Sequence, residues 1–91
     1  MTLQEETLQR QLSAIMSTKD GRAFIWQHLS TCGVFTTSYT NNALDMSYNE
    51  GQRNVGLRLL SDLQDYAFTY FQVMEVEARE PKEEDKDDII E

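Results

Sequence analysis

Residues 47–64 have the sequence SYNEGQRNVGLRLLSDLQ, and this stretch decides the class of fold. Its apolar side chains recur at helical intervals and form one side of a predicted helix: Tyr48, Val55, Leu59, Leu60 and Leu63. Gly51 and Gly56 interrupt that helix, and each costs about 1 kcal/mol relative to alanine. Two such glycines predict either the close approach of another backbone or a kink in the helix.

Two further helices are predicted upstream of this stretch. In the first, Thr2 followed by Glu5 has the pattern of a capping box, and the apolar stripe consists of Leu8, Leu12, Ile15 and Met16. The second begins at Thr18 or Asp20, either of which can cap it, and ends at Gly33, where a left-handed C-terminal cap favours glycine. Its apolar stripe consists of Phe24, Ile25, His28, Leu29 and Cys32.

Residues 33–42 are rich in β-branched and aromatic side chains but have no partner strand, so we expect an extended connector. We expect three of its side chains to lie on the helices: Val34, Phe35 and Tyr39. A fourth helix is predicted from residue 66 to about residue 79, with Asp65 as its cap. The apolar face of this helix consists of Ala67, Tyr70, Phe71, Met74 and Ala78. The short link between the last two helices predicts an antiparallel hairpin.

The predicted fold is therefore all-α: a small bundle of three to four helices with an extended connector and an acidic C-terminal tail. The helical domain comprises residues 1–79 and the tail residues 80–91. Across the 91 residues, 16 Asp and Glu against 8 Lys and Arg give a net charge of −8. Pro81 opens the most charged part and prevents a helix from continuing through it. Such a composition predicts either a disordered, solubilising tail or a tail held by a bound partner. In the second case Ile89 and Ile90 are the expected apolar anchor of the contact.

Composition excludes several classes of protein. The excess of acidic residues argues against direct nucleic-acid binding, which needs a cationic surface. No apolar run approaches the roughly 18 residues of a membrane span, and the N-terminal residues lack the pattern of a signal peptide, so we expect no membrane association. The one cysteine, Cys32, cannot form an internal disulfide and fits a reducing compartment.

The sequence offers little support for catalysis. Residues 51–56 have the two glycines of a phosphate-binding loop, but Leu57 and Arg58 follow where lysine and a hydroxyl residue are required. His28 and Cys32 are four residues apart on one helix face, yet no second cysteine or histidine completes a metal site. We therefore expect no cofactor, no metal and no enzymatic activity.

Trp26 and the arginines are candidate interaction residues. Trp26 lies off the stripe of its helix and is either an exposed anchor for a partner or part of a second core face. Three arginines are expected either to pair with Glu50 and Asp62 or to be scattered surface charge: Arg22, Arg53 and Arg58.

Three strings occur in order along the chain: GRAFIWQHL at 21–29, CGVFTTS at 32–38 and YNEGQRNVGLRLL at 48–60. Together they resemble a family of small tailed-bacteriophage proteins named after a Bordetella phage member. The family pattern is a Gly-Arg opening, a Gly-Val-Phe turn and an Asn-Glu-Gly-x-Arg-Asn-x-Gly helix. The resemblance covers about residues 19–76.

The resemblance implies a role in the virion or in its assembly, because genes of this family usually lie among the head and portal genes of podovirus-like phages. It carries no catalytic residues. The matching positions are expected to be structural or interface residues: Gly21, Arg22, Gly33, Asn49, Glu50, Gly51, Arg53, Asn54 and Gly56. The same role is expected of Trp26, Arg58, Ile89 and Ile90. We expect Arg53 and Asn54 to hydrogen-bond carbonyls of the connector.

Three hypotheses for the function follow. The first is a small structural protein of a tailed-phage virion that binds the portal or another capsid protein in multiple copies and self-associates in a ring or multimer. It would be found in the virion, and in the host cytoplasm during assembly. The second is a non-virion acidic phage protein that acts as an assembly factor or inhibits a host nucleic-acid enzyme by charge mimicry. The third, a Cys32-dependent enzyme, predicts an activity that we do not expect.

Overall fold

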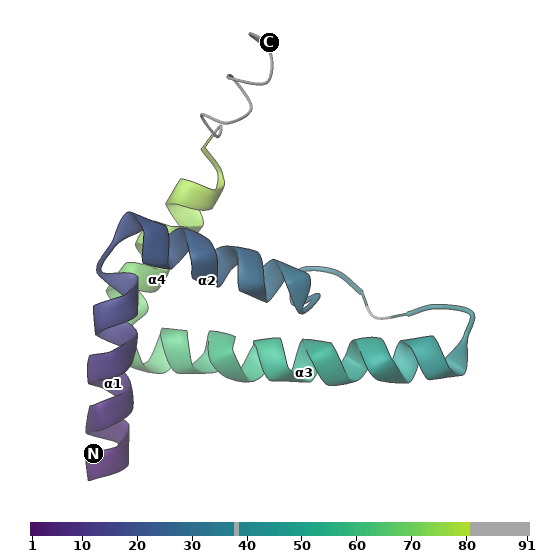
Figure 1. Ribbon diagram of the computed structural model, residues 1–91, viewed down its shortest axis with the longest axis horizontal. Coiled ribbons are helices and arrows are strands. Elements are labelled where there is room, and N and C mark those ends of the chain that lie inside the picture. Colours follow the sequence, from purple (N-terminus) through teal and green to yellow (C-terminus); the bar gives the residue numbers. More distant parts are fainter. Residues whose placement is uncertain (38, 81–91) are drawn as a thin grey trace, which may run out of the picture.

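The computed structural model describes residues 1–37 and 39–80 of the chain. They form four helices (Figure 1): α1 (Leu3–Met16), α2 (Lys19–Thr31), α3 (Ala43–Tyr66) and α4 (Phe68–Ala78). Every helix packs against each of the other three. The prediction of a small all-α bundle is confirmed.

Several predicted features of the helix ends are present in the structure. The Thr2 hydroxyl accepts a hydrogen bond from the Glu5 amide at 3.1 Å, and the Glu5 carboxylate accepts one from the Thr2 amide at 3.4 Å, which confirms the capping box. Of the two predicted caps for α2, Thr18 is the one observed. Gly33 follows the C-cap residue of α2 with a φ of 81°, as the glycine rule predicts.

The predicted bounds of α3 and the predicted cap of α4 are wrong. The amide oxygen of Asn42 accepts hydrogen bonds from the first turn of α3, so this helix begins four residues before Ser47. Asp65 lies inside α3 and caps nothing. The N-cap residue of α4 is Ala67, which has no side chain that could accept a hydrogen bond.

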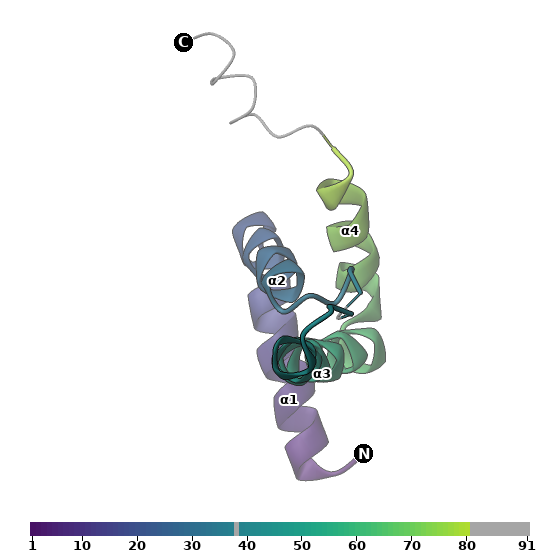
Figure 2. The same cartoon turned by 90° about the vertical axis from the view of Figure 1, so that its right-hand side faces the viewer.

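The hairpin that the sequence predicts for the last two helices is also wrong. Ala67 alone joins α3 to α4, and one residue makes a corner, whereas a helical hairpin needs a loop of about 2–5 residues. Figures 1 and 2 show α4 turning away from the end of α3. The antiparallel pair is instead α2 with α3, linked by the connector.

The core collects side chains from all four helices and from the connector. Its fully buried members are Met16, Leu29, Leu63 and Met74, and Leu12, Ile25, Val34, Ala67 and Phe71 complete it. Several side chains that the stripes place inward are exposed instead: Ile15, Phe24, His28, Tyr48 and Val55. Spacing alone misplaced these side chains because α1 and α2 contact the rest of the bundle over only part of their apolar surface. In addition, the N-terminal half of α3 extends beyond the bundle. Of the connector side chains expected to lie on the helices, Val34 is buried in the core and Phe35 stacks on Trp26 of α2, whereas Tyr39 is exposed.

The molecule is flat, with Cα extents of 43 × 43 × 15 Å, and Figure 2 shows it edge on. The N-terminal half of α3 continues past the end of α2, where only the connector accompanies it (Figure 1). We call residues 43–55 the α3 arm. No helix within residues 1–37 and 39–80 is long and apolar enough to cross a bilayer.

Candidate interaction surfaces

Arg22 ties the beginning of α2 to the end of α4. Its Nε and Nη2 donate to the two carboxylate oxygens of Glu77 at 2.7 and 3.0 Å, and its Nη1 donates to the Met16 carbonyl at 2.9 Å. Only 12% of the Arg22 side chain and 23% of the Glu77 side chain are exposed. Arg22 therefore pairs with a residue 55 positions away, and not with Glu50 or Asp62 as the sequence suggested.

This ion pair makes stability depend on pH. The hydrogen bonds from Arg22 lower the pKa of Glu77 below its ordinary value of 4.5. A lowered pKa in the folded state stabilises the protein above the unfolded pKa and ceases to do so as the pH falls through the folded value. We expect the free energy of unfolding to decrease between about pH 6 and pH 3, and Glu77→Gln to make that decrease shallower. Urea unfolding at several pH values measures the free energy of unfolding for both proteins. If it decreased equally steeply with pH in Glu77→Gln, the decrease would not come from Glu77.

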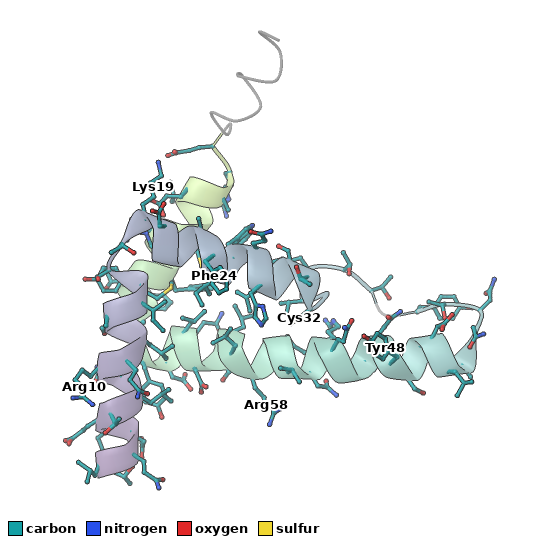
Figure 3. All side chains as sticks on the ribbon, in the orientation of Figure 1. Arg10, Lys19, Phe24, Cys32, Tyr48 and Arg58 are labelled. Carbon is teal, nitrogen blue, oxygen red and sulfur yellow. The ribbon has the colours of Figure 1, made fainter. Side chains whose placement is uncertain are left out.

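Two glycines that match the family pattern lie at close contacts. A Cβ on Gly21 would collide with the Ile15 carbonyl, so this glycine allows the tight turn from α1 into α2. A Cβ on Gly56 would lie 2.5 Å from Val34 Cγ2 and 2.7 Å from Cys32 Cβ. Close approach, one of the two explanations that the sequence left open, therefore applies to Gly56. Figure 3 shows Cys32 at the end of α2 beside α3.

Trp26 is half-buried and packs against the core. Its ring stacks on Phe35 of the connector, with the ring centroids 4.5 Å apart and 24° between the planes. Of the two roles that the sequence left open, the structure favours the second core face. Trp26 holds the connector onto α2.

The remaining family positions on α3 make fewer contacts than expected. Arg53 Nε is buried and has no hydrogen-bond acceptor among the described residues. Within the same part of the chain, neither Arg53 nor Asn54 hydrogen-bonds a carbonyl of the connector, contrary to the prediction. Glu50, Gly51 and Asn54 line a shallow hollow between the connector and α3. Asn49 is half-buried and lines a second hollow between the end of α2 and α3.

The other candidate residues have surface positions or lie outside the described part. Arg58 is exposed and projects from the side of α3 opposite α2 (Figure 3). His28 is exposed and stacks on Phe24, with centroids 6.3 Å apart. Residues 1–37 and 39–80 contain no group of three or more side chains that could hold a metal ion. Ile89 and Ile90 lie beyond the described residues.

The outer face of α4 was not singled out by the sequence patterns. Five uncharged side chains recur at helical spacing there: Phe68, Thr69, Gln72, Val73 and Val76. We call this set the α4 outer face. Its apolar members are exposed by 54% at Phe68, 38% at Val73 and 55% at Val76. The opposite side of α4 is buried in the core, so this helix is apolar on both sides. Because helices that are apolar all round are normally covered all round, this feature could have been found by examining both faces of the segment.

A comparison with protein families supports the resemblance seen in the sequence. The family model of Bbp19-like phage proteins matches residues 12–70. The chain belongs to this family. Among the family positions, the Bbp19-like match includes Gly21, Arg22, Gly33 and the whole α3 arm, and it ends at the third residue of α4. Neither a curated protein nor a solved structure matches the chain.

Proposed function

We propose that this Bbp19-like phage protein is a small structural component of the virion that binds the portal or another head protein in multiple copies. Membership of a phage protein family supports the phage context. The observation that carries the binding role is the α4 outer face, an apolar surface that residues 1–37 and 39–80 leave uncovered on a helix whose other side is already in the core.

The charge that follows α4 in the sequence indicates the chemistry of the partner. Residues 80–91 carry seven acidic and two basic side chains, directly after the α4 outer face. A partner that covers both would present an apolar patch beside a basic surface, because complementary charge favours encounter and fixes orientation. Packaged DNA, which is anionic, would repel the same segment.

The proposal is tested by quantitative mass spectrometry of purified virions, with this chain scaled against the portal and the major capsid protein. A small multiple of the portal copy number would support binding at the portal vertex. A ratio near that of the capsid protein would support another head protein as the partner. Absence from mature particles would contradict the virion role and favour an assembly factor or a regulator of a host enzyme.

The α4 outer face is tested in the same assay by Val76→Glu. A carboxylate placed in an apolar contact must be desolvated without a partner, so we expect at least about a tenfold loss of incorporated copies, equivalent to about 1.4 kcal/mol. Gln9→Glu adds the same charge at an exposed position of α1 and is expected to leave incorporation unchanged. Equal incorporation of both variants would show that α4 is not the binding face.

A further inference from the structure

Four residues of the α3 arm form an apolar line that nothing in the described chain covers. Leu44, Tyr48, Gly51 and Val55 follow one another at intervals of four, three and four residues, the spacing of a coiled-coil seam. The exposed fractions are 82% for Leu44, 66% for Tyr48 and 50% for Val55, and Gly51 is also exposed. We call these four residues the arm seam.

The arm seam lies away from α2 and Val34, and only Gly51 at its edge borders the hollow that the connector forms with α3. The α2 side of the helix is marked by Gly56, which contacts Val34 and Cys32. By helical geometry, the seam residues point well away from Gly56 around the axis. Figure 1 shows that the arm passes beyond α2, and Figure 3 labels Tyr48 on it.

No contact within residues 1–37 and 39–80 requires a glycine at position 51. A Cβ built on it meets nothing within 4 Å, and its backbone does not have the positive φ that favours glycine. An exposed glycine in a helix interior nevertheless costs about 1 kcal/mol relative to alanine. A gap at the middle of an exposed apolar seam is what a second helix requires for close approach.

We propose that the arm seam binds the arm seam of a second copy, with the two α3 arms antiparallel about a twofold axis near residues 49 and 50. An antiparallel pairing that places Tyr48 opposite Gly51 of the other copy also places Leu44 opposite its Val55. Each large ring then fills the space that the opposite glycine leaves, as a knob enters a hole. A parallel pairing would instead set tyrosine against tyrosine and leave the two glycines facing an empty space.

The charges at the two ends of the seam favour the same orientation. Asp45 lies in the first turn of α3, and Arg58 occupies the next seam position after Val55. In the antiparallel pair, the end of one arm that carries Arg58 lies alongside the end of the other arm that carries Asp45, so the two ends attract each other over a distance. In a parallel pair each end would lie beside an end of the same charge.

The contact is small, so the free chain should associate weakly. Three turns of one helix bury much less than the about 800 Å² per partner of a standard interface, and we expect a Kd of about 10–100 µM. A twofold contact closes after two copies, so a larger ring would need a second surface. The proposed dimer rests on the proposed function, in which several copies of the chain act together. The two proposals can fail separately, because self-association is measured on the purified chain without virions.

Sedimentation equilibrium of the full chain between about 1 µM and 1 mM, a range that brackets the expected Kd, tests the proposal. We expect a monomer–dimer equilibrium, and Gly51→Gln and Tyr48→Ala each to raise the dimer Kd at least about tenfold. Gly51→Gln fills the hole while improving helix propensity, so a weaker dimer could not be attributed to unfolding. Circular dichroism of each variant confirms that the helices are retained.

Ser61→Gln is the matched control, because it introduces the same side chain at an exposed position of α3 that lies off the seam. Its dimer Kd is expected to stay within about twofold of the parent chain. A chain that remains monomeric at 1 mM would overturn the proposal. A dimer that Gly51→Gln and Tyr48→Ala leave unchanged would also overturn it, because the contact would then lie elsewhere.

Discussion

Replacing Arg22 with methionine is expected to lower the free energy of unfolding by about 2 kcal/mol. Hydrogen bonds to charged groups contribute about 1.5–3 kcal/mol, and the change leaves the partly buried Glu77 carboxylate without its partner. Arg22 donates to both Glu77 oxygens and to the Met16 carbonyl, so all three acceptors lose a donor. Methionine keeps the apolar stem, so the loss reports on the guanidinium and not on packing. Urea denaturation at pH 7 measures the change.

Two further variants separate the ion pair from a general effect of removing positive charge. Arg58→Met removes the same charge from an exposed position and should change stability by less than about 0.5 kcal/mol. Combining Arg22→Met with Glu77→Leu should recover part of the loss, since replacing both members of a buried pair by apolar groups is far less costly than removing one. Equal losses for Arg22→Met and Arg58→Met would contradict the proposed role of the pair.

The features that could be predicted from the sequence depend on neighbouring residues. The Thr2 capping box, the Thr18 cap and the left-handed Gly33 each involve groups within about three residues, so local residue chemistry decides them. The family resemblance rested on three strings in order, and the matched region, residues 12–70, contains all three.

The features that could not be predicted depend on how distant elements meet. The hydrogen-bond partner of Arg22 is 55 residues away, and no spacing rule connects two such positions. The direction of α4 is set at the single residue Ala67, which is buried in the core and has a non-helical backbone conformation, with φ −144° and ψ 45°. Two residues of the arm seam, Tyr48 and Val55, were predicted to belong to a core face because they have helical spacing. Only the structure shows that α2 stops short of them and that both are exposed.

The two glycines of α3 illustrate the same limit within one helix. In the sequence, Gly51 and Gly56 have the same cost in helix propensity and the same two explanations. In the structure, the Cβ position of Gly56 is occupied by Val34 and Cys32, whereas that of Gly51 opens onto solvent. Gly56 is therefore needed for the fold of the single chain, whereas no contact among the described residues requires a glycine at position 51.

Replacing Gly56 with valine is therefore expected to lower the free energy of unfolding by about 2–3 kcal/mol, near the upper end for an overpacked core. The better helix propensity of valine offsets only a few tenths of a kcal/mol of this loss. The contacts cannot relax easily, since Cys32 Cβ is next to the α2 backbone and Val34 is part of the core. Gly51→Val adds the same side chain to the same helix where nothing lies within 4 Å, and at low protein concentration its effect should stay below about 0.5 kcal/mol. Urea denaturation of the two variants side by side measures the contrast. Similar losses at both positions would mean that the packing of α3 against Val34 and Cys32 does not hold the fold together as described.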